Sequence, residues 1–125
     1  MPADRPDMTP AEQAVWCALQ RHLGRAQAVT VEQLAATTGL SDRRVRRAVK
    51  ALVEVHRIAI ASSPHRPAGY CLPLTAEDVL ETYRSLRGRA LSILHRAAVL
   101  RRQSLPALLG QLALEIAEQE ARCGR

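Results

Sequence analysis

Five cationic side chains occupy eight successive positions in the middle of the chain, within the sequence RRVRRAVK from Arg43 to Lys50. At about 100° per residue on a helix, they lie on one face and its flanks, opposite an apolar stripe of Val45, Ala48, Val49 and Leu52. Arginine can donate paired hydrogen bonds to the O6 and N7 atoms of guanine, and both Arg and Lys bind phosphates. A solvated surface helix normally mixes charges of both signs, so this excess of one sign predicts a polyanionic ligand.

The positions of these cations on the helix suggest separate roles for them. Arginines near the start of such a helix are placed for base edges, and cations elsewhere on it for the DNA backbone. We therefore predict base contacts for Arg43, Arg44 and Arg47, and phosphate contacts for Arg46 and Lys50. Ser41 belongs to the same predicted site, and Asp42 is assigned to stability because an anion complements the helix dipole at this end.

Helix starts that could position this site are marked by five candidate N-cap residues, namely Thr9, Thr30, Ser41, Thr75 and Ser104. Thr9 with Glu12 and Thr30 with Gln33 have the spacing of capping boxes. The pattern predicts a first helix over residues 10–23, with Val15, Trp16, Leu19 and Leu23 buried and Gly24 as its C-terminal cap. It also predicts a short strand over residues 27–29 and a second helix over residues 31–37. That helix presents Val31, Leu34 and Ala35 and ends at Gly39, so the turn before Ser41 makes a helix-turn-helix.

A β-hairpin is predicted directly after the cationic helix. Residues 57–61 alternate in polarity like a half-buried strand, residues 62–69 are rich in turn-forming types, and Tyr70, Cys71 and Leu72 resume an extended pattern. A hairpin in this position is called a wing. His65 and Arg66 at its tip are candidates for contact with the minor groove or the flanking backbone, and a solvated loop is an equally good interpretation.

The last two-fifths of the chain are predicted to form two helices, with a break near Ser104 because Pro106 disfavours helical geometry at Leu105. Apolar residues recur at alternating spacings of four and three, as in a coiled coil or an antiparallel helix pair. Such a seam must pack on its own helix pair, on the winged domain or on a second subunit. The residues predicted to support dimerisation are Val79, Tyr83, Leu86, Ile93, Leu100, Leu109, Leu112 and Ile116.

The segment from Thr30 to Val53, TVEQLAATTGLSDRRVRRAVKALV, resembles the helix-turn-helix of bacterial winged-helix regulators. The segment from Gly69 to Leu100, beginning GYCLPLTAEDVLETYRSLRG, is similar to the tail of small winged-helix proteins of bacteriophages and prophages. The first resemblance implies DNA binding, and the second implies a role in phage transcription or replication. The expected fold is mainly α with a small β-hairpin wing. It comprises a flexible N-terminus (1–8), a winged helix-turn-helix domain (9–74) and a C-terminal helical extension (75–125).

Composition narrows the functional classes further. The net charge is +6, and residues 21–60 hold eight basic and three acidic side chains, which fits double-stranded DNA as the partner. The sequence has neither a signal peptide nor an apolar run of membrane-spanning length, so we expect a cytoplasmic protein without a membrane partner. The three cysteines form no metal-binding pair and are expected to be free.

No catalytic motif is present in the sequence, so we expect no enzyme, no cofactor and no metal site. His22, His56 and His95 are interpreted as surface or capping residues. The main alternative to a DNA-binding homodimer is a winged-helix module that binds another protein, such as a polymerase, a helicase or a repressor. A phage replication accessory protein would belong to that class. An anionic membrane surface is disfavoured because the large apolar residues opposite the cations are needed in the core.

Overall fold

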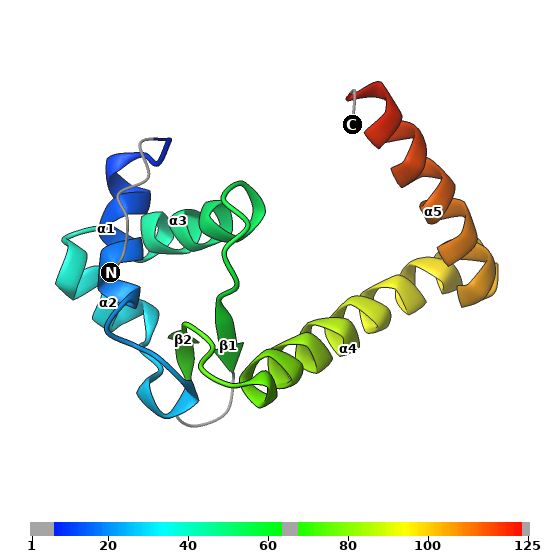
Figure 1. The fold of residues 1–125 in the computed structure, drawn as a ribbon. Coiled ribbons are helices and arrows are strands. Elements are labelled where there is room, and N and C mark those ends of the chain that lie inside the picture. The colour runs from blue at the N-terminus through cyan, green and yellow to red at the C-terminus, as the bar shows by residue number, and fades with distance from the viewer. Residues whose placement is uncertain (1–6, 64–67, 124–125) are drawn as a thin grey trace. The chain divides into compact units, whose positions relative to one another are not determined.

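The computed structural model describes residues 7–63 and 68–123, and these residues fall into two compact units that divide within one long helix, between Arg84 and Ser85. Figure 1 shows the order of the elements along the chain. They are α1 (Pro10–Leu19), a 3-10 turn η1 (Arg25–Gln27), α2 (Val31–Thr38), α3 (Asp42–Glu54), β1 (Ala61–Ser63), β2 (Gly69–Cys71), α4 (Ala76–Arg101) and α5 (Leu105–Arg122). The expected fold class, helical with a small antiparallel hairpin after the helix-turn-helix, is confirmed.

All five predicted caps are present. Thr9 and Thr30 form complete capping boxes with Glu12 and Gln33, and the Ser41 and Ser104 side chains accept from the backbone of the third helical residue. The Asp78 N–H donates to Thr75 Oγ1 over 3.2 Å. Each cap satisfies an amide that the first turn leaves without a helical partner, which explains why these starts could be located from the sequence.

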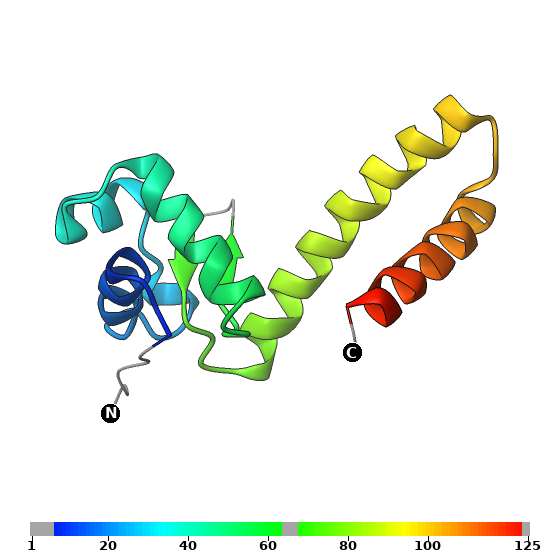
Figure 2. The same ribbon diagram turned by 90° about the horizontal axis from the view of Figure 1, so that it is seen from above.

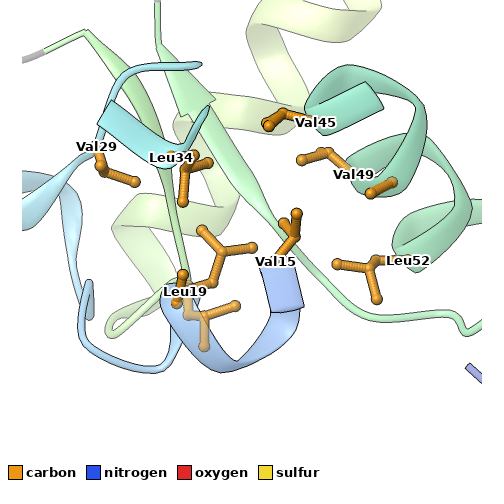
Figure 3. Packing of buried hydrophobic residues seen from close by; sticks show 10 residues of the cluster. Val15, Leu19, Val29, Leu34, Val45, Val49 and Leu52 are labelled. Atoms are coloured by element: carbon orange, nitrogen blue, oxygen red, sulfur yellow. The ribbon is translucent and has the colours of Figure 1, made fainter. Parts of the chain in front are cut away.

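The core of the first unit lies where α1, α2 and α3 meet. Figure 3 shows side chains from all three helices, together with Val29, converging on one centre. The predicted stripe of α3 is buried, Val31 and Ala35 of α2 pack at the margin, and Trp16 is half-buried beside the cluster. The buried members are Val15, Ala18, Leu19, Val29, Leu34, Val45, Ala48, Val49, Leu52 and Leu72.

The β1–β2 hairpin, hereafter the wing, is antiparallel and pairs Ala61 with Cys71 and Ser62 with Tyr70. Tyr70 also exchanges two backbone hydrogen bonds of 2.8 Å with Val29, which adds a third short stretch to the sheet. Gly69 lies at φ +124°, and a Cβ atom on it would be 2.1 Å from the Val29 carbonyl oxygen. Only glycine fits at this close approach.

The first helix is shorter than predicted. It ends at Leu19 with Gln20 as its C-cap, so Gly24 does not cap it, and Leu23 is 48% exposed instead of buried. The cause is a backbone contact with the return strand: Leu72 N–H donates to the His22 carbonyl and Gly24 N–H donates to the Leu72 carbonyl, both over 2.8 Å. The predicted strand at residues 27–29 is reduced to Val29, because Arg25–Gln27 form a 3-10 turn.

The first wing strand begins later than predicted, at Ala61 instead of residue 57. Arg57 has φ +57°, a left-handed conformation that reverses the chain after α3. The Ile58 N–H then donates to the Leu52 carbonyl over 3.0 Å, which fixes this reversal. The alternating pattern of residues 57–61 therefore spans a helix exit and a linker before the strand.

In the second unit, α4 ends at Arg101, shortly before the predicted break near Ser104. Arg102 has φ +53°, and the chain reverses there before Ser104 caps α5, as Figure 2 shows. The predicted break near Ser104 is thus confirmed. The apolar residues that are buried in this unit are Ala98 and Leu108, so within the described residues most of the predicted seam stays accessible. No helix of the described chain is both long and apolar enough to cross a bilayer.

Candidate nucleic-acid interface

Helix α3 presents a cationic face to solvent. Its apolar stripe is buried to 6% exposure or less, whereas the five cations on the other side are all exposed. None of these five side chains forms an ion pair within residues 7–63 and 68–123. The cationic face of α3, defined as Arg43, Arg44, Arg46, Arg47 and Lys50, therefore has guanidinium and ammonium groups available for an external anion.

The turn between α2 and α3 sets the direction of this face. Gly39 ends α2 in the left-handed conformation (φ 77°, ψ 10°), and its N–H donates to the Ala35 carbonyl over 2.9 Å. The Thr38 hydroxyl donates to the Leu34 carbonyl over 2.7 Å and also accepts from the Leu40 N–H. Ser41 Oγ then accepts from the Arg44 N–H over 3.2 Å. This chain of local bonds fixes a short connection between the two helices.

An open hollow lies between the first turn of α1 and the cationic face. It is lined by Thr9, Pro10, Ala11, Glu12, Arg44, Arg47 and Ala48. Two arginines thus border a hollow at the N-terminal end of a second helix, where the helix dipole favours negative charge. The sequence pattern alone did not bring α1 beside these arginines, because the contact joins residues more than thirty positions apart.

The far end of α3 is tied to α1 by a buried histidine. The His56 side chain is 2% exposed, its Nε2 lies 2.9 Å from Glu12 Oε1, and its Nδ1 lies 3.4 Å from Asp7 Oδ2. Both partners lie at or before the start of α1, so the ring links the exit of α3 to that end of the first helix. The hydrogen bond to His56 is the main reason that the pKa of Glu12 lies below its ordinary value. The sequence interpretation of His56 as a surface or capping residue missed this burial.

The base of the wing is tied to the start of α4. The Ser62 N–H donates to Thr82 Oγ1 over 3.2 Å, and Arg25 of the 3-10 turn forms an ion pair with Glu81. Asp78 Oδ2 accepts from the Leu74 and Thr75 backbone N–H groups over 3.0 and 3.2 Å, and the Leu74 bond is the largest cause of the lowered pKa of Asp78. The Ser62–Thr82 and Arg25–Glu81 contacts were not predicted, because separations of 20 and 56 residues follow no helical or strand period.

The tip of the wing, with the predicted contacts His65 and Arg66, lies outside the described residues. The cysteines are free, as expected, and Cys71 is the buried one. Burial raises the pKa of the Cys71 thiol, and the nearby Asp78 carboxylate adds to this effect. The thiol is thus kept in its protonated, less reactive form.

The residues predicted to support dimerisation are mostly exposed within the described chain. Val79 and Tyr83 lie on the part of α4 that belongs to the first unit, and the rest lie in the second unit. Leu112 is half-buried. The exposed members are Val79, Tyr83, Leu86, Ile93, Leu100, Leu109 and Ile116.

Comparison with known proteins agrees with this geometry. Residues 7–55 match the family model described as a helix-turn-helix domain, a range that covers α1, α2 and α3. No curated protein and no solved structure matches the chain. Helix-turn-helix domains typically bind DNA through the second helix of the motif. Residues 7–55 are therefore similar to a helix-turn-helix domain, and α1, α2 and α3 are the three helices of that segment.

Proposed function

We propose that this protein binds specific sequences in double-stranded DNA by placing α3 in the major groove, and that it acts there as a transcriptional regulator. The observation that carries the proposal is the cationic face of α3. Five exposed cations on the second helix of a helix-turn-helix, opposite a fully buried stripe, match the surface that this motif presents to base edges and phosphates.

Within this proposal the residues have distinct roles. Arg43, Arg44 and Arg47 contact base edges, and Arg46 and Lys50 contact phosphates, with Ser41 at the start of the helix beside them. Arg44 and Arg47 border the hollow beside α1, so a backbone phosphate at their edge of it would meet two guanidinium groups. His65 and Arg66 contact the minor groove or the backbone that flanks the site.

In this proposal the protein is a cytoplasmic homodimer, and it is encoded by a bacterium or a phage. Residues 9–74 form the DNA-binding domain, and residues 75–125 form an extension that joins two copies. One winged domain makes few contacts, and a dimer on two inverted half-sites doubles them. The exposed apolar residues of α4 and α5 support the joining role.

A purified duplex-binding assay tests the proposal. The probe is a random-sequence duplex library and the duplexes that the unmodified protein selects from it. The double variant Arg43→Ala/Arg47→Ala is expected to lose retention of the selected duplexes while its helical circular dichroism signal stays unchanged. A control variant, Arg21→Ala/Arg122→Ala, removes the same charge from positions outside α3 and should keep most of the affinity. Equal affinity of the two double variants would refute the assignment of α3.

A protein-interaction module is the second candidate, because the apolar residues along α4 and α5 are accessible. The two candidates differ in their response to salt. Binding to DNA through several phosphates weakens steeply as salt rises, whereas a mainly apolar protein interface does not. If the chain shows no salt-dependent retention of any duplex, the protein-interaction function is the one to accept.

A further inference from the structure

The second compact unit, Ser85–Arg125, has too little core to be stable as a single pair of helices. Its part of α4 and the whole of α5 are each about 25 Å long, at 1.5 Å per residue. Yet Ala98 and Leu108 are its buried apolar residues among those described. Two long helices that bury so little apolar surface do not offset the entropy of ordering their chain. Something outside the unit must therefore cover these helices.

Apolar residues of this unit form one stripe on each helix, of which Ala97, Leu105 and Leu112 are half-buried and the other members are exposed. Leu91, Val99 and Leu114 are also exposed but lie outside the stripes. The α4 stripe consists of Leu86, Ala90, Ile93, Ala97 and Leu100, and the α5 stripe consists of Leu105, Leu109, Leu112 and Ile116. Leu86 is 51% exposed, Ile93 57% and Leu100 84%. The buried Ala98 lies about 120° around α4 from its stripe, at 100° per residue. In this chain α5 therefore leaves the α4 stripe uncovered.

Opposite charges flank the two stripes. Residues 85–102 contain five arginines and no acidic residue, whereas α5 contains three glutamates and one arginine. On the helix surface Arg89 and Arg96 lie on one side of the α4 stripe and Arg101 on the other, about 60 to 80° from its centre. Glu115 and Glu120 flank the α5 stripe in the same manner, at about 50 to 90°. All of these flanking side chains are exposed.

We propose that two copies of the chain form a four-helix bundle in which α5 of each copy packs on the α4 stripe of the other. This deepens the dimer of the proposed function, because it names the helices that pair between copies. Residues that flank an apolar seam determine which helices pair. Pairing of α4 with α4 would oppose arginines, whereas pairing of α4 with the partner's α5 places arginine beside glutamate along a shared apolar seam. The lengths of the two helices match, so the seam extends along both.

Charge reversal followed by mixing tests the pairing. In one variant, Arg89→Glu/Arg96→Glu makes both helices acidic, and in the other, Glu115→Arg/Glu120→Arg makes both basic. In sedimentation equilibrium without DNA, each variant alone is expected to self-associate at least about tenfold more weakly than the unmodified chain, since several ion pairs become repulsive together. Mixing the two variants should restore a 1:1 dimer, because each α4 then meets a partner α5 of opposite charge.

The mixing step separates pairing between copies from pairing within one chain. If α4 and α5 pair within one chain, the two helices carry like charges in each variant and repel each other before and after mixing. Mixing would then not restore the 1:1 dimer, and the proposal would be overturned. If α4 pairs with α4, the arginine-reversed variant alone should associate as well as the unmodified chain, which would overturn it equally. An unmodified chain that stays monomeric throughout the micromolar range would also refute the proposal.

Two matched controls keep the outcome interpretable. Leu100→Ser removes a stripe residue and should weaken association, whereas Val99→Ser, at an adjacent and also exposed position off the stripe, should leave it unchanged. Gly88→Glu adds a negative charge on the opposite side of α4 in open space and should not weaken association. Equal effects of Leu100→Ser and Val99→Ser would contradict the seam. Retention of a single half-site duplex reports on α3 separately, so failure of the bundle and failure of DNA binding remain distinguishable.

Discussion

Gly69 shows how one residue controls the wing. Its backbone is left-handed, and the Val29 carbonyl lies where a side chain would begin. We predict that Gly69→Ala lowers the free energy of unfolding by about 2 kcal/mol or more, because strain and a backbone clash add. Gly39→Ala is the matched control: its φ is also positive but its surroundings are open, so about 1 kcal/mol is expected. Urea unfolding measures the free energy of unfolding of both variants. Similar losses for Gly69→Ala and Gly39→Ala would show that the clash with the Val29 carbonyl is relieved by a local shift.

Glu12 gives the stability of the first unit a dependence on acid. Its pKa is lowered in the folded chain from an ordinary value of 4.5, chiefly by the hydrogen bond with His56. As pH falls, the unfolded chain takes up a proton at this position first. The stabilisation from Glu12 is therefore fully present above about pH 4.5 and is lost as pH falls through the lowered pKa.

We predict that Glu12→Gln lowers the free energy of unfolding at neutral pH by about 1 to 2 kcal/mol, because a charge-assisted hydrogen bond is lost. The variant should also lose less stability than the unmodified chain between neutral and strongly acidic pH. Urea unfolding across that range measures both effects. Glu32→Gln serves as the control, since Glu32 occupies the first turn of α2, is exposed and forms no ion pair among the described residues. Parallel acid profiles for Glu12→Gln and the unmodified chain would contradict the role of His56.

At the scale of one element, α3 combines a structural cap with a predicted DNA contact at Ser41. Ser41→Ala should cost about 1 kcal/mol of stability, because the Arg44 amide loses its acceptor. Ser41→Asp should keep that stability, since Asp is an equally good cap. It should nevertheless weaken duplex binding, because it adds a negative charge beside the phosphates. Thermal unfolding and duplex retention measured on the same samples separate the two roles. Undiminished binding by Ser41→Asp would place the N-terminus of α3 away from the DNA.

The elements that the sequence predicted well are those governed by local chemistry. The five caps and the buried stripe of α3 depend on residues within a few positions of one another, and all are present. The errors arose where distant backbone pairing competed with local pattern. The apolar spacing of Leu23 predicted that α1 continues to this residue, but Leu23 instead pairs with Leu72 and is not helical. Residues 57–60 alternate like a strand, but the left-handed Arg57 makes them a helix exit.

The candidate site was predictable in part for the same reason. The cationic face of α3 follows from helical period alone. The histidine clamp at its far end depends on a contact between His56 and Glu12, 44 residues apart. The seam residues of α4 and α5 were found from their spacing, whereas their exposure within one chain required the structure.

At the scale of the whole molecule, the proposed dimer would place its two α3 helices on two half-sites on one face of the duplex. We predict that the selected duplexes contain inverted half-sites whose centres are about 10 base pairs, or a multiple of that, apart. Inserting about 5 base pairs between them should rotate one half-site to the opposite face and reduce affinity to that of a single half-site. Gel-shift titration of the two duplexes measures this. Equal affinity for both would show that the two domains bind independently.

The hydrogen bond between Ser62 and Thr82 has a consequence for synthesis of the protein. The backbone of β1 receives one of its acceptors from a residue twenty positions downstream, and Glu81 beside it pairs with Arg25. A nascent chain that has emerged only as far as Leu72 contains all three helices of the first unit and both wing strands, but it lacks the acceptor for Ser62. The wing therefore reaches its full set of bonds only after the first two turns of α4 have left the ribosome.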